Sequence, residues 1–593
     1  MDSKIDTSPL PITVTEADQI ISRYGNDAPS PLPSNHSHSL TTLHQNSSGL
    51  TLAHQDQDQQ HSTTNHPSDQ NQHHHSQNAS KHPSQEFDPN RVTWLPDDPE
   101  NPQSWSDKRK WVLTVICGII TVNATFASSA PSSATEDIVK QFGVSLEVAT
   151  LVTSLFLCGY IAGPLIWAPL SELIGRRPVF LGTMISYVIL QLGEALNTNL
   201  QTILVIRFLS GVAASAPLTN CGGLIADIWD PIYRAPAISI FTASAFIGPV
   251  LGPIVGSFVA GSYLGFRWIF WLMMIIGGGF TAMVYFGLPE TYAPILLAKR
   301  AKKRRAEENR PELYSDHERA DFSVKGILHR TLLRPFKMLA SEPILVLVTV
   351  YLSIVYGLLY GLFEAFPIIW GDLRGFTPTQ IGLLFIGVGI GTTLGAVMNI
   401  YLQQSLKTLV PKWHGHPPCE VHLYGSMLAG PFLVIGIFWL GWTGAYASIP
   451  WWVPAISTIL LGASFTLVFI SFQAYLIDVY LMYSASALAA NTICRSAFGA
   501  AFPLFTRQMF EGLGVQWAAT LIGCVGLLIS PSPFIFYKYG SRIRTRSKFA
   551  PNLDLQMKST VEEEEQREKT QEKKTEETMA GKSNNHQKGP EIV

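Results

Sequence analysis

Charge is scarce in this chain of 593 residues: Asp, Glu, Lys and Arg together make up 15% of it, against 47% hydrophobic residues. Whole stretches lack charge altogether, such as residues 111–134 and 436–477. A helix that crosses a bilayer needs about 20 mostly apolar residues, whereas a helix in a soluble core needs only one apolar stripe. The lack of charge therefore argues against an ordinary multidomain soluble protein and indicates a membrane protein.

Paired cysteines and the motifs of common enzymes are missing as well. The six cysteines show no CxxC or other paired spacing, and five of them fall in apolar segments, which favours buried thiols over disulfides or metal ligands. The chain has no GxxxxGK[ST], HExxH or GxSxG motif and no zinc-ligand spacing. ATP is therefore not its direct energy source, and a membrane enzyme is disfavoured. We expect no cofactor, no bound metal and no nucleic-acid partner.

What is present is a polar start, a long apolar middle and a polar end. Residues 1–108 are rich in Ser, Thr, Gln, Asn, Pro and His, a composition that cannot bury enough apolar surface to fold. The histidine run at 73–75 is compatible with metal binding, but a low-complexity tail is the favoured interpretation. Twelve spans are predicted near residues 111–131, 147–169, 178–197, 201–223, 236–260, 267–288, 343–370, 379–402, 422–444, 452–477, 484–508 and 516–537.

The spans divide into six plus six around a charged loop. This pattern predicts two pseudo-repeated bundles with the substrate path between them. The predicted parts are a disordered tail, an N-terminal six-helix bundle, a central loop, a C-terminal six-helix bundle and a second disordered tail. Their boundaries are 1–108, 109–289, 290–342, 343–538 and 539–593.

The Lys and Arg residues predict the orientation of these bundles. They gather before the first span, between spans two and three, in the central loop and after the last span. Because basic loops stay in the cytoplasm, both termini should be cytoplasmic, as an even number of spans requires. The basic central loop is interpreted as a topology signal in contact with anionic lipid. The cell membrane is the expected location, with the vacuolar membrane as the alternative.

The loop between spans two and three carries the first functional motif, from Pro169 to Pro178. Gly175 allows a tight turn, and Arg176 and Arg177 lie at the membrane face. An acid beside these arginines would form a latch that breaks when the two bundles rock. The alternative is that the arginines serve only the topology.

This loop resembles the signature loop of the major facilitator superfamily, in its fungal drug:proton antiporter form, the multidrug and polyamine branch. It departs from the general pattern at Ala168, Glu172 and Leu173, which replace Gly, Asp and Arg. The resemblance implies that Glu172 faces the cytoplasmic start of span eleven. It also implies that Arg176 pairs with an acid at the end of span four, where Asp227 is well placed.

Span four contains Arg207, which cannot lose its charge and so needs a carboxylate, carbonyls or a wet cavity inside a membrane. The family's corresponding motif is implicated in proton coupling. The alternative is an arginine that reaches the outer interface, because Arg207 lies near the start of its span.

Span five contains glycines at every fourth position, which let another helix approach closely, and prolines that bend the helix. The Gly-Pro-x-x-Gly-Pro form resembles the antiporter motif that distinguishes exporters within the superfamily. A packing seam without directional meaning is the alternative. The motif residues are Gly248, Pro249, Gly252, Pro253 and Gly256.

Polar residues inside the spans are few, and each is a functional candidate. Glu364 lies in an apolar helix and is the best candidate for a carboxylate that exchanges protons. The alternative is a structural glutamate hydrogen-bonded between helices. The residues expected to line a substrate cavity are Asn123, Tyr360, Phe363, Gln473, Asn491 and Arg495.

Together these motifs cover about residues 100–545. The resemblance implies a monomeric proton-coupled exporter of a drug, toxin or secondary metabolite, which works by alternating access. Glu364 and Arg207 would couple protons to transport, whereas Glu172, Arg176 and Asp227 would close the cytoplasmic side. A polyamine exporter, an organic-acid exporter and a transporter-like membrane sensor remain as alternatives.

Overall fold

The computed structural model describes residues 88, 90–95, 98–230, 233–319, 333–413 and 417–586. The predicted polar tail up to residue 87, with its histidines, lies outside these residues. From Asn90 onward the chain belongs to one compact unit. Within its described part, helices account for the regular structure, and the single isolated β-bridge joins Arg91 and Tyr314.

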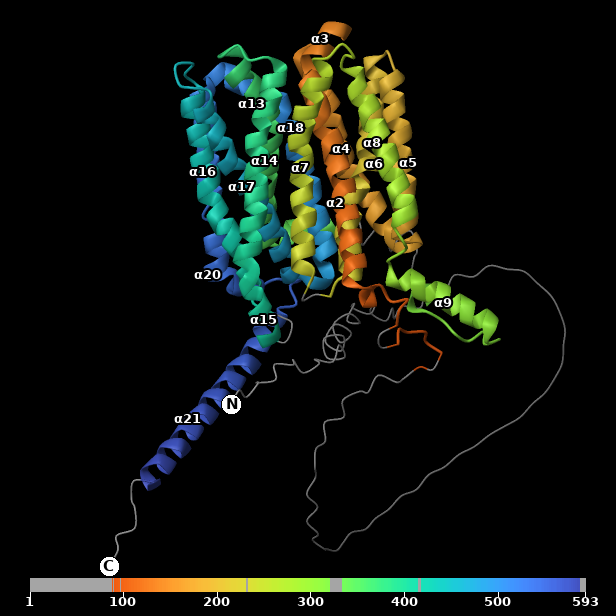
Figure 1. Ribbon diagram of the computed structural model, residues 1–593, viewed down its shortest axis with the longest axis vertical. Coiled ribbons are helices and arrows are strands. Elements are labelled where there is room, and N and C mark those ends of the chain that lie inside the picture. Colours follow the sequence, from red (N-terminus) through yellow and green to blue (C-terminus); the bar gives the residue numbers. More distant parts are fainter. Residues whose placement is uncertain are drawn as a thin grey trace, which may run out of the picture. The chain divides into compact units, whose positions relative to one another are not determined.

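Six long helices make up the first half of this unit, and a 3-10 turn, η2 (Ala130–Ala134), with a short helix, α3 (Thr135–Phe142), joins the first to the second. The six are α2 (Asp107–Ser129), α4 (Leu146–Ile174), α5 (Arg176–Leu196), α6 (Leu200–Ile228), α7 (Arg234–Ala260) and α8 (Arg267–Gly287). In Figure 1, α3 lies at one end of the bundle and α9 (Ala293–Glu307) at the other, and we call these the α3 end and the α9 end.

The second half repeats this arrangement. The first of its helices continues into a π-helical turn, η4 (Pro367–Asp372), and the last is broken near Pro531. The helices are α13 (Pro343–Phe366), α14 (Pro378–Leu402), α16 (Tyr424–Gly444), α17 (Trp452–Tyr480), α18 (Ser484–Leu513) and α19 (Val515–Ile529) followed by α20 (Ser532–Arg544).

The packing within the two halves shows the repeat directly. In the first half α2 packs on α7, α4 on α6 and α5 on α8; in the second half α13 packs on α18, α14 on α17 and α16 on α19. The halves meet through two equivalent pairs, α7 with α14 and α4 with α18. The prediction of an all-helical membrane protein built from two six-helix bundles is confirmed.

Among the described residues, eleven helical segments are long and apolar enough to cross a membrane. They coincide with eleven of the twelve predicted spans and mostly extend a few residues beyond them. The remaining predicted span corresponds to α18, a helix of 30 residues that contains Arg495, Arg507 and Glu511. Because α18 packs between α4 and α13, the bundle buries Arg495. Arg507 and Glu511 instead pair with each other near the end of the helix.

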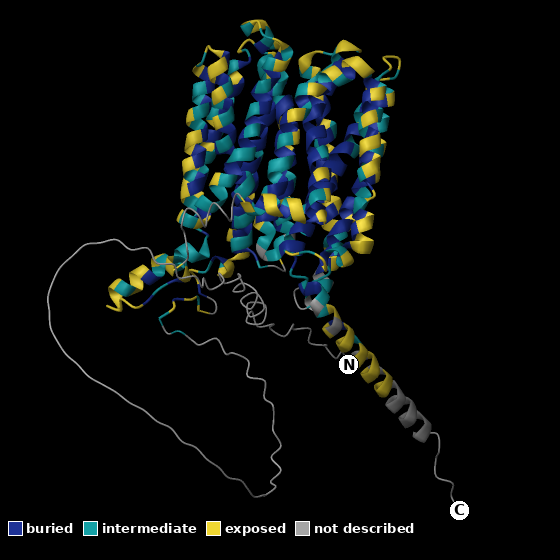
Figure 2. Cartoon of the chain, turned by 180° about the vertical axis from the view of Figure 1, so that it is seen from behind, coloured by how far each residue is buried: buried dark blue, intermediate teal, exposed yellow. Residues whose placement is uncertain are grey.

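Buried and exposed residues are distributed as expected for a membrane protein. Figure 2 shows buried residues concentrated between the helices and exposed residues on the outer faces of the bundle. Many of the exposed side chains on the outer faces are large and apolar, for example Ile189, Val205, Val397 and Leu528. A contiguous apolar surface of this kind is unfavourable in water and suits contact with lipid.

The segment before α2 departs from the predicted disorder. Val92 is buried with Ala301 and Leu313, and Asp98 accepts a hydrogen bond from Arg300 of α9. This hydrogen bond holds the pKa of the Asp98 carboxyl below its ordinary value. The described residues from 90 to 106 therefore dock on the central loop, a contact that local composition does not reveal.

The central loop contains helices of its own. In addition to α9, the described residues of 290–342 form α10 (Asp316–Arg319) and α12 (Arg334–Ser341). Arg305 of α9 reaches Glu318 of α10, with Nη2 2.5 Å from Oε1. The loop is therefore held together by charge pairs as well as by the small apolar cluster around Ala301.

The end of the chain also differs from the predicted disorder, because Leu553–His586 forms helix α21. Its sequence is rich in Glu, Lys and Gln, which are good helix formers. Asp554 in its first turn accepts two hydrogen bonds of 2.8 Å from Arg544, and Arg544 also donates to Glu420 at 2.7 Å. These contacts join α21 to the end of α20 and to the start of the ninth span.

We predict that Arg544→Gln destabilises the protein. Arg544 is 1% exposed, and removing one partner of a buried charge cluster costs about 3–5 kcal/mol because the remaining carboxylates lose their cation. The measurement is the melting temperature of the purified protein in detergent. Arg542→Gln, at an exposed position two residues earlier, is the matched control. Equal melting temperatures for the two variants would contradict the anchoring role of Arg544.

Candidate functional site

A hydrogen bond to Tyr360 of α13, which lies beside Tyr356 on the same helix, joins the two halves. Tyr360 forms a 2.6 Å hydrogen bond with Ser128 of α2, and its hydroxyl lies 3.4 Å from that of Tyr356. Tyr160 of α4 donates to the Ala124 carbonyl at 2.7 Å. All three tyrosines are buried. The contact between Ser128 and Tyr360 joins the first helix of each half at the point where a substrate path is expected.

Arg495 of α18 lies against this tyrosine pair. Its guanidinium carbon is 5.4 Å from the ring centroids of Tyr356 and Phe469, and the residue is 8% exposed. Its Nε has no hydrogen-bond partner, and within the described part of the chain no carboxylate pairs with it. Cation–π contacts of this kind offset part of the cost of burying the charge. Asn491, one turn earlier, is also buried with an unpartnered Oδ1.

Glu364 lies one helical turn after Tyr360 on α13. It is 5% exposed, and the described residues provide it with neither a hydrogen bond nor an ion pair. The alternative of a structural glutamate hydrogen-bonded between helices is therefore not what the structure has. We call Arg495, Tyr356, Tyr360 and Asn491, together with Glu364 one turn further along α13, the central cluster. The cation whose charge acts on Glu364 is Arg507 of α18.

The other residues expected in the cavity do not share one site, since Asn123 lies beside Tyr187 of α5 whereas Gln473 contacts the other half. Asn123 is 3% exposed with an unpartnered Oδ1. Gln473 is half-buried and accepts a 3.5 Å hydrogen bond from Thr242, which belongs to the other half. Phe363 packs 5.4 Å from the ring of Phe385, so it belongs to the core of the second half as well as to this region.

Arg207 is buried inside the first half, with no exposed surface. It donates 2.9 Å hydrogen bonds to the carbonyls of Val152 and Ala127, and its Nη1 lies 3.4 Å from Glu194 Oε2. Ser210 donates to the other Glu194 oxygen at 2.7 Å. Arg207 is thus satisfied by carbonyls and a carboxylate rather than by the membrane interface.

Sequence reasoning missed Glu194. It lies three residues before the predicted end of its span, which suggests an interfacial residue, yet it is completely buried. The same reasoning missed Phe469, although Phe469 lies four residues before Gln473 and so shares its helix face. The spacing from Gln473 was the signal that could have identified Phe469.

The glycine motif of α7 packs directly on the first helix. A Cβ at Gly248 would lie 2.6 Å from the backbone nitrogen of Phe126, and one at Gly252 would lie 2.7 Å from that of Ala130. A Cβ at Gly256 would lie 2.4 Å from the Ala130 carbonyl oxygen. The structure therefore shows a close packing seam along three successive turns of α7. Pro249 and Pro253 lie within this helix and are buried.

The loop between α4 and α5 brings Arg176 to Asp227. Arg176 Nε lies 3.1 Å from Asp227 Oδ2, and its Nη1 donates to Ser171 at 2.6 Å. Its guanidinium also lies 5.0 Å from the ring centroid of Tyr292, whose pKa is raised to about 12 by burial. These contacts all join parts of the first half.

Glu290 completes this loop from the segment after α8. Its Oε1 accepts hydrogen bonds from the backbone nitrogens of Arg176, Thr291 and Tyr292, and its Oε2 accepts one from Arg177. Gly175 has φ of 103°, and a Cβ there would lie 2.4 Å from Glu290 Oε2. Glycine is therefore required both by the backbone and by the carboxylate beside it.

The remaining two residues of the expected latch are placed differently. Glu172 is exposed and has no hydrogen bond or ion pair to any described residue. Arg177 donates to the Tyr285 carbonyl at 2.9 Å, and its Nε is buried without a partner. Arg176 thus pairs with the Asp227 carboxylate, whereas the side chains of Glu172 and Arg177 form no ion pair with a described residue. Arg176 and Asp227 lie in the same half.

Residues 115–503 match the sequence profile of the Major Facilitator Superfamily. The chain is 41% identical over 480 residues to the MFS-type efflux pump MFS2 of Trichophyton rubrum, covering 80% of each chain. It is 40% identical over 461 residues to the citrinin biosynthesis cluster MFS transporter mrr1 of Monascus ruber, covering 77% of this chain and 91% of that one.

The fold is similar to that of a solved transporter. The xylose transporter XylE from E. coli superposes with a TM-score of 0.52 at 18% sequence identity, over 73% of this chain and 98% of that chain. At this identity the likeness concerns the fold alone. It supports the two-bundle arrangement that the packing of the helices shows.

We predict that Gly252→Ala impairs the protein. The new Cβ would lie 2.7 Å from the backbone nitrogen of Ala130, so α2 and α7 must separate, at a cost of about 1–3 kcal/mol. Gly278→Ala in α8, where nothing lies within 4 Å, is the matched control. The measurements are the melting temperature in detergent and the transport rate in vesicles. Unchanged values for Gly252→Ala would show that the seam tolerates extra volume.

Proposed function

The chain belongs to the major facilitator superfamily, and from this premise we propose that it exports small organic molecules in exchange for protons. Drugs, toxins and secondary metabolites are the expected substrates. Two observations on relatives support export: one is named an efflux pump and another belongs to a citrinin biosynthesis cluster. The Gly-Pro motif of α7 supports antiport by resemblance.

The observation that carries this proposal is the central cluster. Glu364 and Arg495 are buried, Arg495 against the tyrosine pair and Glu364 one turn beyond it on α13. Neither forms an ion pair or a side-chain hydrogen bond with a described residue, and Arg507 of α18 is the cation whose charge acts on Glu364. Burying an ionised group without a partner is costly, and ionisable residues inside membranes mark ion and substrate paths. Alternating access would move these two groups between buried and wet surroundings.

In this proposal Glu364 takes up a proton from one side and releases it on the other. A carboxyl buried without a partner is stable only as the neutral acid, whereas water entering the path allows it to ionise. Arg207 has a supporting role, because its carbonyl partners and Glu194 already satisfy its charge.

The α9 end is proposed to face the cytoplasm, because it carries the basic residues of α9 and of the loop between α4 and α5. Arg176 and Asp227 would then stabilise the cytoplasmic side of the first half as a rigid block. The division into bundles at 109–289 and 343–538, with the loop 290–342 between them, follows as part of the same proposal. The cell membrane is the proposed location.

We predict that Glu364→Gln abolishes pH-driven transport, because an amide cannot ionise. The measurement is solute accumulation in inside-out vesicles with an imposed pH gradient, using a panel of metabolites, drugs, polyamines and organic acids. Wild-type protein should accumulate one class only when the gradient is present. Glu136→Gln, an exposed glutamate near the α3 end, is the control.

Two outcomes of that experiment would contradict the proposal. Full gradient-driven transport by Glu364→Gln at normal expression would remove Glu364 from the coupling step. No movement of any solute by correctly inserted wild-type protein would favour the transporter-like sensor instead.

Within this function, one observation favours weak organic acids as the substrate. Arg495 is a buried cation with an unpartnered Nε beside the aromatic rings of Tyr356 and Phe469. An aromatic acid would give it a counter-ion and stack on the same rings. A polyamine would need several carboxylates, and the central cluster offers only Glu364.

We predict that Arg495→Gln lowers transport of organic acids by about tenfold to a hundredfold, because a hydrogen bond to a charged group contributes about 1.5–3 kcal/mol. Arg495→Lys, which keeps the charge, should retain part of the activity. Transport of neutral compounds by the same vesicles is the comparison. An equal loss for neutral and acidic solutes would show that Arg495 does not select by charge.

A further inference from the structure

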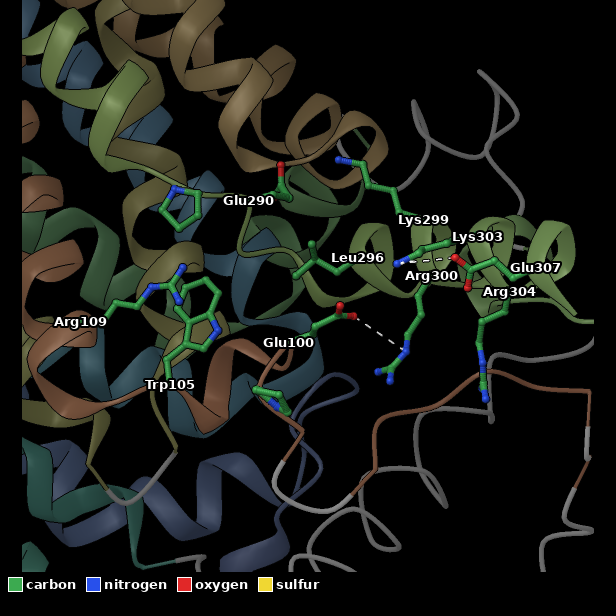
Figure 3. Close-up of a pocket in the computed structure, with 12 residues that line it drawn as sticks. Glu100, Trp105, Arg109, Glu290, Leu296, Lys299, Arg300, Lys303, Arg304 and Glu307 are labelled. Atoms are coloured by element: carbon green, nitrogen blue, oxygen red, sulfur yellow. Dashed lines mark ion pairs between the residues drawn. The ribbon is translucent and has the colours of Figure 1, made fainter.

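Two neighbouring pockets lie at the α9 end, outside the transport path. The larger has a volume of about 670 Å³ and lies between the start of α2, the segment after α8, and α9. The smaller has about 290 Å³ and shares Arg109 and Pro289 with the larger one. Figure 3 shows the larger pocket, with Trp105 and Arg109 on one side and the basic side chains of α9 on the other.

The larger pocket has an excess of cations that the protein does not neutralise. Its acids are already engaged: Glu100 lies 3.9 Å from Arg300, Glu307 lies 3.8 Å from Lys303, and Glu290 binds backbone nitrogens. Arg109 and Lys299 also line this pocket, and neither has a carboxylate partner among the described residues.

The position of Arg109 is fixed by its neighbour. Its guanidinium carbon lies 3.7 Å from the centroid of the Trp105 ring, and this stacking leaves its N–H groups free to bind an anion. Such a fixed, unneutralised cation suits a phosphate group, to which a guanidinium can donate two hydrogen bonds.

The smaller pocket combines two arginines, Arg109 and Arg177, with apolar residues at the ends of α2 and α8. It is lined by Val112, Leu113, Phe286, Gly287 and Leu288 together with Arg177. Val112 is 58% exposed and Phe286 is 86% exposed, at the ends of helices that face the bilayer. Arg177 adds a buried Nε without a partner. An amphiphile with one anionic end and one apolar end fits the two pockets together.

We propose that these two pockets bind an anionic phospholipid. The headgroup phosphate occupies the larger pocket against Arg109 and Lys299, and an acyl chain lies along Val112 and Phe286. The alternative source of the same chemistry is a free organic phosphate, which would use the larger pocket alone. The apolar residues of the smaller pocket, among them the exposed Phe286, favour the lipid.

The test is native mass spectrometry of the full chain, purified in detergent and offered an equal mixture of phosphatidylinositol and phosphatidylcholine. Wild-type protein should retain phosphatidylinositol preferentially. The double variant Arg109→Gln/Lys299→Gln should bind it about tenfold or more weakly, since each basic residue contributes to attraction of an anionic lipid. Monodispersity in gel filtration shows that the variants fold.

The matched control is Lys108→Gln/Lys302→Gln, which removes the same charge at two exposed positions that line neither pocket. An equal loss of phosphatidylinositol binding in this control would show that the effect comes from net charge alone. That result would overturn the proposed site. Phe286→Ala should weaken retention of the lipid but not of soluble glycerophosphoinositol. If glycerophosphoinositol displaces the bound lipid as effectively as intact phosphatidylinositol does, the ligand is a free phosphate and the lipid assignment is wrong.

Discussion

The backbone of helix α7 is in close contact with two other helices, α2 of its own half and α14 of the other half. Its glycines pack on α2, where a Cβ at Gly248 or Gly252 would meet backbone nitrogens. On its other side, a Cβ at Gly382 of α14 would lie 2.8 Å from the Pro253 carbonyl oxygen. Lipid supplies no hydrophobic drive between helices, so such close van der Waals contact is what holds them together. The contact of α7 with α14, together with the packing of α4 on α18, sets the place of the first half relative to the second.

The division into two halves determines which charged side chains change their surroundings when the halves move. Arg207 and Glu194 lie on α6 and α5, and their partners all belong to the first half. A motion of one half against the other leaves this pair intact. Glu364 and Arg495 belong to α13 and α18, next to the hydrogen bond between Ser128 and Tyr360 that joins the halves. In the proposed function the pair of Arg207 and Glu194 would keep a structural role, whereas Glu364 and Arg495 would lie where the motion changes their environment.

Most of the fold could be predicted from the sequence because the bilayer imposes the length and polarity of each span. The predicted spans and the observed helices therefore coincide, even for the charged α18. The loop motif also identified the contact between Arg176 and Asp227, since short motifs encode local geometry. Glu194 could not be identified as buried, because its burial depends on Arg207 from another helix. The order of the described residues between 90 and 106 and of α21 likewise depends on contacts across the fold, those of Asp98 with Arg300 and of Arg544 with Asp554.

The pairing of Arg176 with Asp227 bears on how the α9 end can open. Because both residues belong to the first half, their ion pair makes that half rigid but does not close it against the second. A second arginine at this end, Arg234 before the membrane-spanning part of α7, donates hydrogen bonds to the carbonyls of Ala226 and Trp229 in the same half. Burial lowers its pKa, whereas Asp478 of α17 and Asp227 of α6 oppose that effect. Arg176 and Arg234 thus both bond within the first half, so neither set of contacts has to break when that half moves against the second.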